Sequence, residues 1–216
     1  MKTAEVLRND VEQELRWEPS VSAEKIGVSV NHGVVALSGH VGSWYEKWAA
    51  ERAALRVINV TSIASEIVVD VPFASHRTDE DIASAATSHL KWNFQVPDSI
   101  KVKVDHGWVT LQGIAEWQYQ REEAERVVRS LRGVIAVMNE IELKPKISAT
   151  GVKTKIEDAL RRDAQIDANS ITVEATGSAV VLRGHVHSWT ERQDAEHAAF
   201  GAPGVTSVTN LITISH

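Results

Sequence analysis

The chain has 216 residues, of which 43% are hydrophobic and 24% charged, a composition typical of a soluble globular protein. Its formal net charge of −6 at pH 7 disfavours nucleic acid as a partner, because the average field repels a polyanion. The sequence contains no Cys, which excludes disulfides and thiolate chemistry.

The first segment, residues 1–17, is predicted to form an amphipathic helix. It carries charges throughout and lacks the apolar run of about 7–15 residues that marks a secretory signal. No stretch of the chain approaches the roughly 18 apolar residues of a membrane span. We therefore expect no transmembrane segment and a cytoplasmic protein, or a periplasmic protein if a signal has been removed.

The next elements are a hairpin, a second helix and a final strand. The stretch "KIGVSVNHGVVALSG" alternates apolar and polar residues on both sides of a turn at Asn31–Gly33, which predicts a β-hairpin. Ala49, Ala50, Ala53 and Ala54 then recur at helical spacing, and such small side chains let a helix lie close to a sheet. Asn59 suits the left-handed end of that helix, and an alternating strand follows it.

The same order of elements recurs twice along the chain. Three Leu-x-Gly anchors are separated by 74 and 71 residues, and each is followed eleven residues later by Ala. A Gly or Asn stands nine residues beyond each Ala, so the downstream halves align without gaps. The residues of this fold signature are Gly39, Gly113, Gly184, Gly133 and Gly204.

The repeat predicts an α+β protein with three tandem α-β-β-α-β units. Each unit would be a three-stranded mixed sheet covered by two helices. We place unit 1 at residues 1–72, unit 2 at residues 76–144 and unit 3 at residues 147–216. The two linkers are short and each contains Pro, so we expect the units to pack against one another around a pseudo-threefold axis.

The motifs "GVVALSGHV", an Ala-rich helix and "GVTSVTN" resemble the BON domain, the bacterial OsmY and nodulation domain. Unit 1 departs from the family pattern at Asn59 and Ser65, where Gly and Asn are usual. The resemblance implies a non-enzymatic protein linked to osmotic or envelope stress. Several members of the family are proposed to contact phospholipid.

The sequence shows no motif for catalysis or for a cofactor. It has no Gly-x-Ser-x-Gly elbow, no His-Glu-x-x-His and no Walker loop, so we expect neither enzymatic activity nor a cofactor. His185 and His187 would project to one side of an extended segment, as two metal ligands do, and His40 matches His185 in unit 1. Without a visible third ligand, these histidines are weak metal candidates, and the main interpretation is surface loop residues.

The Trp residues are the main candidates for partner contact. Trp44, Trp117 and Trp189 stand at the predicted starts of the second helices, and Trp48 lies one turn after Trp44. Trp117 is one position early, aligned with Ser43. One interpretation is an aromatic contact rim, since Trp suits surfaces that are dry on one side and wet on the other. The alternative is packing on the unit's own sheet or on a neighbouring unit.

A basic stretch is a second candidate surface, formed by Lys144, Lys146, Lys153 and Lys155. Each cation adds about 1 kcal/mol of attraction to an anionic membrane surface. The alternative interpretation is a solvated linker.

Three functions therefore compete. The first is a stress-related binding or scaffolding protein with a protein or membrane-surface partner. The second is a peripheral protein that binds anionic phospholipid. The third is a carrier of small ions or ligands.

Overall fold

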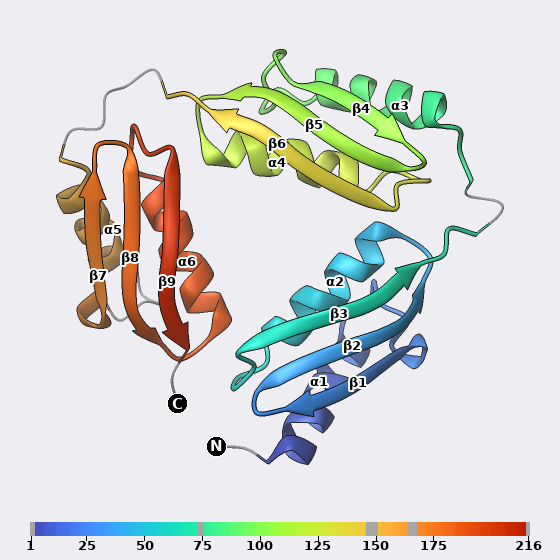
Figure 1. Cartoon of the computed structure of the whole chain (residues 1–216), viewed down its shortest axis with the longest axis horizontal. Coiled ribbons are helices and arrows are strands. Elements are labelled where there is room, and N and C mark those ends of the chain that lie inside the picture. The colour runs from blue at the N-terminus through green and yellow to red at the C-terminus, as the bar shows by residue number, and fades with distance from the viewer. Residues whose placement is uncertain (1–2, 73–75, 146–150, 164–167, 215–216) are drawn as a thin grey trace.

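The computed structural model describes residues 3–72, 76–145, 151–163 and 168–214, and each repeat forms its own three-stranded sheet (Figure 1). Unit 1 contains α1 (Ala4–Trp17), β1 (Ile26–Asn31), β2 (Val34–Val41), α2 (Trp44–Leu55) and β3 (Ser62–Val69). Unit 2 contains α3 (Asp79–Trp92), β4 (Lys101–Asp105), β5 (Trp108–Ala115), α4 (Gln118–Arg129) and β6 (Ala136–Leu143). Unit 3 contains α5 (Val152–Arg162), β7 (Ile171–Thr176), β8 (Ala179–Val186), α6 (Trp189–Phe200) and β9 (Ser207–Ile214). The predicted α+β fold and its order of elements are confirmed.

The three sheets have the same mixed topology. In unit 1, β1 pairs antiparallel with β2, and β2 pairs parallel with β3, so that β2 lies in the middle. A parallel pair needs a crossover connection, and α2 supplies it between β2 and β3. Units 2 and 3 repeat this pairing with β5 and β8 in the middle. The helices therefore lie on one face of each sheet.

Each unit has a hydrophobic core of its own between the sheet and its two helices. In unit 1 this core contains Leu7 and Val11 of α1, Leu37 of β2, and Ala50 and Ala53 of α2, all of them buried. The predicted Ala stripe is thus the face with which α2 meets the sheet. Separate clusters form the cores of units 2 and 3.

The Gly of each Leu-x-Gly anchor is required by a close approach of backbone. Gly39, Gly113 and Gly184 have φ values of 132°, 137° and 134°, a region that side chains disfavour. A Cβ at these positions would collide with the carbonyl oxygens of Lys25, Ser99 and Ser170, respectively. The anchor is therefore a site where the backbone entering the first strand lies unusually close to the middle strand.

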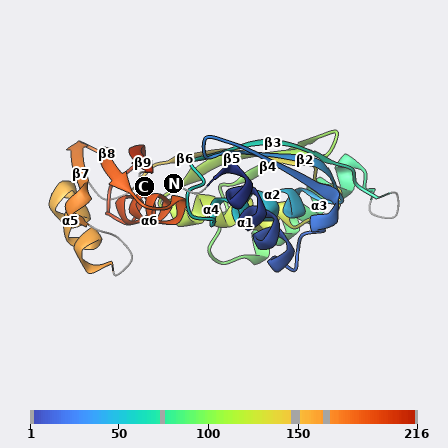
Figure 2. The same ribbon diagram turned by 90° about the horizontal axis from the view of Figure 1, so that it is seen from below.

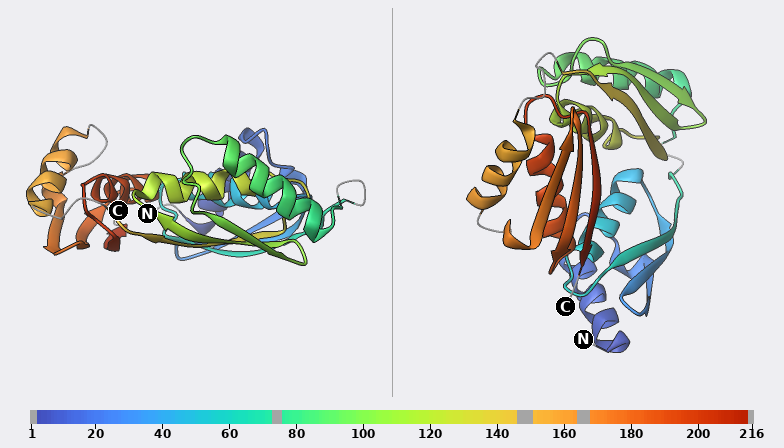
Figure 3. Two further views of the ribbon diagram at one scale, coloured as in Figure 1. Left: turned by 90° about the horizontal axis from the view of Figure 1, so that it is seen from above. Right: turned by 60° about the vertical axis from the view of Figure 1, so that its left-hand side comes forward.

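The three units are arranged around a common centre (Figure 1). The second helices α2, α4 and α6 face this centre, while α1, α3 and α5 lie on the periphery. Figure 2 and the left view of Figure 3 show that units 1 and 2 have their sheets on one side of the molecule and their helices on the other. Among the described residues, no helix is both long and apolar enough to cross a membrane.

Candidate functional site

The second helices begin in two different ways. In units 1 and 3 a Ser side chain caps the helix, because Ser43 accepts from the Glu46 N–H and Ser188 from the Glu191 N–H, each at 3.1 Å. In unit 2, Trp117 takes the cap position without a side-chain hydrogen bond to the helix. The Gln120 carboxamide accepts from the Trp117 N–H at 3.1 Å instead. Trp117 therefore stands one position early because it occupies the N-cap position that Ser43 and Ser188 hold in the other two units.

The candidate Trp residues at the helix starts are half-buried and have different neighbours. Trp44 packs against the hydrophobic core of unit 2, although it belongs to unit 1. Trp189 lies under its own unit's Arg192, with the guanidinium 4.7 Å from the ring centroid. Trp117 is half-buried as well. This placement favours the packing interpretation for Trp44, and the idea of one rim of Trp residues stays a prediction.

Trp48, one turn further along α2, joins two units through arginines. The Arg52 guanidinium lies 5.0 Å from the Trp48 ring centroid, and the Arg129 guanidinium of unit 2 lies 4.0 Å from it. Arg129 is 8% exposed, and burial lowers its pKa. Its Nη2 donates to Glu125 over a long 3.4 Å, while its Nε has no hydrogen-bond partner within the described parts of the chain. A cation is thus buried at the contact between units 1 and 2.

These side chains border a cavity of about 630 Å³ where all three units meet, which we name the junction cavity. It is lined from unit 1 by Trp48, Glu51, Arg52 and Leu55, from unit 2 by Gln95, Tyr119, Glu122, Glu123, Glu125, Arg126 and Arg129, and from unit 3 by Gln193 and His197. The cavity is therefore amphipathic, with charges of both signs around a few aromatic and aliphatic groups.

An ion pair at the cavity connects units 2 and 3. The Nε2 atom of His197 lies 3.6 Å from Oε1 of Glu122. Burial by itself raises the pKa of Glu122, but the interaction with His197 and the hydrogen bond from Gln118 outweigh it and the pKa falls below its ordinary value. The pKa of His197 is raised, chiefly by the same interaction with Glu122. Both shifts favour the charged pair.

The structure does not gather the predicted metal candidates. His40 contacts Asp70 at 2.5 Å, His187 lies 3.6 Å from Glu191, and His185 is exposed. Within the described residues, the one group with ligand atoms close enough for a metal is Asp79, Asp105 and His106. The Asp79 carboxylate accepts from the backbone N–H groups of His106 at 2.7 Å and Gly107 at 2.9 Å, so it holds the β4–β5 turn to α3.

The described lysines of the basic stretch are exposed. Lys144 pairs with Glu142 at 3.0 Å and Lys153 with Glu157 at 3.8 Å, while Lys155 is exposed on α5. Lys146 lies outside the described residues. Carboxylates therefore offset the charge of two of the three described lysines.

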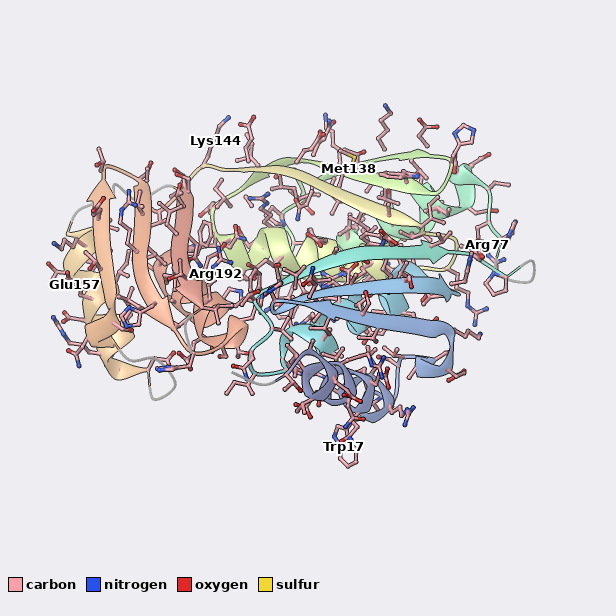
Figure 4. All side chains as sticks on the ribbon, turned by 60° about the horizontal axis from the view of Figure 1, so that its bottom comes forward. Trp17, Arg77, Met138, Lys144, Glu157 and Arg192 are labelled. Atoms are coloured by element: carbon pink, nitrogen blue, oxygen red, sulfur yellow. The ribbon has the colours of Figure 1, made fainter. Side chains whose placement is uncertain are left out.

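The most exposed aromatic side chains lie at the ends of the first helices. Trp17 ends α1 and is 83% exposed; Trp92 ends α3 and is 88% exposed; Phe94 follows it at 95%. Figure 4 shows Trp17 projecting away from the ribbon. We call Trp17, Trp92 and Phe94 the aromatic tips. None of the three was predicted from the sequence as a contact residue, and the signal in unit 2 is the Trp-Asn-Phe run at the end of α3.

Comparison with known proteins assigns the chain to a family. The BON domain matches three segments, residues 3–70, 78–145 and 148–215, so the chain belongs to the BON domain family and carries three copies of the domain. It is 29% identical over 132 residues to the osmotically-inducible protein Y of Escherichia coli (strain K12). That match covers 58% of this chain and 65% of the relative's length.

Two solved structures of CdsD, a structural protein of the type III secretion system of Chlamydia trachomatis, also align with the chain. One has 16% identity and a TM-score of 0.27, covering 97% of this chain and 92% of that chain. The other, of the C-terminal domain, has 14% identity and the same TM-score of 0.27, with complete coverage of both chains.

Proposed function

We propose that the chain is a non-enzymatic, osmotic-stress-related binding protein that attaches to anionic phospholipid surfaces through its aromatic tips. The stress role is supported by the family and by the relative described as osmotically inducible. The non-enzymatic role is supported by the junction cavity, where Glu122 and Glu123 are tied to His197 and Arg126. A cytoplasmic location stays a prediction.

The observation that carries the proposal is the exposure of the tips. Trp17, Trp92 and Phe94 are each more than four-fifths exposed, although large aromatic side chains gain free energy by leaving water. Trp and other amphipathic aromatics are favoured at the boundary between lipid and water. Their placement at helix ends lets them enter that boundary without disturbing either core.

The charges beside the tips fit an anionic surface. The last turn of α1 carries Arg16, and the last turn of α3 carries His89 and Lys91. Each cation near an anionic membrane contributes about 1 kcal/mol of attraction. Since the whole chain has a net charge of −6, attachment must depend on such local groups. Lys144 and Trp17 lie on opposite sides of the molecule in Figure 4, so the tip of unit 1 is separate from this end of the basic stretch.

The test is flotation of the full chain with phosphatidylcholine vesicles, with and without phosphatidylglycerol, at low salt. We expect binding only to the anionic vesicles. The double variant Trp92→Ala/Phe94→Ala should weaken it by about tenfold or more, because burial of one such side chain gives about 1.5–3 kcal/mol. Trp189→Ala is the matched control, since it removes a half-buried Trp from a helix start and should bind as the unaltered protein does.

Absence of binding to anionic vesicles at low salt would refute the lipid proposal and favour a protein partner at the tips. Full binding by the double variant, together with loss on Lys144→Gln/Lys155→Gln, would move the lipid surface to the basic stretch.

A further inference from the structure

A basic residue stands at the same position in each unit and faces the junction cavity. Arg52, Arg126 and His197 each lie thirteen residues after the Gly of their Leu-x-Gly anchor, and all three line this one cavity. Arg129 of α4 adds a fourth cationic side chain. The repeat therefore concentrates cationic groups where α2, α4 and α6 meet (Figure 1).

Three of these four groups have carboxylate partners, although Arg129 reaches Glu125 only over a long 3.4 Å. Arg126 donates to both oxygens of Glu123, at 2.6 and 2.5 Å, and His197 pairs with Glu122. The Glu125 carboxylate accepts from the Asn139 side-chain amide at 3.2 Å and only weakly from Arg129. Of the four carboxylates that line the cavity, Glu122, Glu123 and Glu125 are thus engaged, and Glu51 is the fourth.

Arg129 is the buried group with an unmet donor, and Arg52 is an exposed guanidinium open to solvent. In the part of the chain that the structure describes, the Arg52 side chain makes no hydrogen bond or ion pair, and its guanidinium lies 5.0 Å from the centroid of the Trp48 ring. Arg129 is more than nine-tenths buried and has an unpartnered Nε. Stacking on an indole satisfies the flat face of a guanidinium but none of its in-plane N–H donors.

Two guanidiniums near one indole also repel each other. The pKa of Arg129 is lowered first by burial, which Glu125 partly offsets, and then further by the positive charge of Arg52. A buried cation without a full set of hydrogen bonds is costly, and the oxygens of carboxylate and phosphate groups match the guanidinium fork.

We propose that the junction cavity binds a small oxyanion-bearing solute, with its carboxylate or phosphate held by Arg52 and Arg129. The side chains of Trp48, Leu55 and Tyr119 form the apolar wall against the body of the solute. The volume of about 630 Å³ lies within the roughly 300–1,000 Å³ typical of small-molecule sites. This inference does not depend on attachment to lipid. The proposed contacts come from units 1 and 2, so the bound solute links these two units.

The test is NMR of the full chain with ¹⁵N-labelled arginine, observing the side-chain Nε–H signals without lipid present. Inorganic phosphate and succinate are titrated separately, with sodium chloride at matched ionic strength as the reference. We expect at least one of the two anions to shift the Arg129 and Arg52 signals along a saturating curve. The anion that does so identifies the head group as phosphate or carboxylate.

Two variants distinguish binding at a specific site from a general effect of the protein's charge. Arg52→Gln should weaken binding by about tenfold or more, as expected for loss of a charge-assisted hydrogen bond. Arg52 is exposed, so this variant tests the proposal without the risk of unfolding that Arg129→Gln carries. The control is Arg183→Gln, which removes the same charge from an exposed position on β8. Arg183 pairs with Glu174, away from the cavity lining, so this variant should leave affinity unchanged.

Shifts that rise linearly, or that chloride reproduces, would overturn the proposal. So would an Arg183→Gln effect as large as that of Arg52→Gln. Each of these readouts is independent of the vesicle experiment.

Discussion

The two contacts that unit 2 makes with its neighbours are of different kinds. Towards unit 1 the contact is aromatic, with Trp44 on the core of unit 2 and Trp48 against Arg129. Towards unit 3 it includes the pair of Glu122 and His197, whose side chains are 45% and 60% exposed. Burial of aromatic surface stabilises far more than an exposed ion pair, which contributes about 0–1 kcal/mol. We therefore expect units 1 and 2 to unfold as one block and unit 3 to be held more loosely.

The largest expected effect comes from Trp44→Ala. The change removes the side chain that unit 1 places on the core of unit 2, and should lower the free energy of unfolding by about 2–3 kcal/mol, below the usual range for a fully buried Trp. Chemical denaturation should then show units 1 and 2 unfolding separately. Trp189→Ala at the equivalent position of unit 3 is the control and should leave their joint transition intact. A single unchanged transition in Trp44→Ala would contradict the coupling.

A stabilising change in unit 1 tests whether the aromatic contact couples the unfolding of unit 2 to that of unit 1. Asn139 in unit 2 donates to the Arg121 carbonyl at 2.9 Å, and Asn210 in unit 3 donates to the Arg192 carbonyl at 3.0 Å. The equivalent Ser65 has a buried hydroxyl with no hydrogen-bond partner among the described residues.

Ser65→Asn should therefore raise the free energy of unfolding of unit 1 by about 1 kcal/mol, the value of one net hydrogen bond. Hydrogen exchange should slow in unit 2 as well as in unit 1. The converse change, Asn210→Ser, should speed exchange in unit 3 alone. Slower exchange confined to unit 1 in Ser65→Asn would show that the units are uncoupled.

The smallest expected effect is a pH dependence of the contact between units 2 and 3. The pKa of His197 is raised, chiefly by its interaction with Glu122, so its contribution is present at lower pH and is lost as pH rises through that pKa. The interaction with His197 and the hydrogen bond from Gln118 hold the pKa of Glu122 below its ordinary value despite the opposing effect of burial, so its contribution is lost as pH falls through that lower pKa.

The contact should therefore be strongest between the two pKa values, with a contribution below about 1 kcal/mol because both groups are exposed. Small-angle scattering against pH should show a small expansion above the pKa of His197. His197→Gln should abolish that expansion, whereas His187→Gln should preserve it. An expansion that persists in His197→Gln would assign the pH response to another group.

Local patterns predicted the units, because their causes are local. The Leu-x-Gly anchors mark a close approach of backbone, and Ala50 marks the face of a helix within the same unit. The left-handed φ of 76° at Asn59 likewise follows from the geometry of a helix end.

The junction could not be predicted in the same way, because it depends on how the units face each other. Trp48 and Arg129 are far apart in sequence and belong to different repeats, so no periodicity connects them. A signal was nevertheless present, since Arg52, Arg126 and His197 are basic residues at one aligned position. The exposure of Trp17, Trp92 and Phe94 at the helix ends was likewise visible only in three dimensions.

The covalent linkage of the three units has a consequence for the centre of the molecule. Arg129 occupies the position that Leu55 holds in unit 1 and Phe200 in unit 3. In a trimer of identical subunits, one mutation would have placed three guanidiniums around the same centre, where they would repel one another. A tandem chain lets each copy mutate by itself, so this position can carry a charge in one unit and an apolar side chain in the other two.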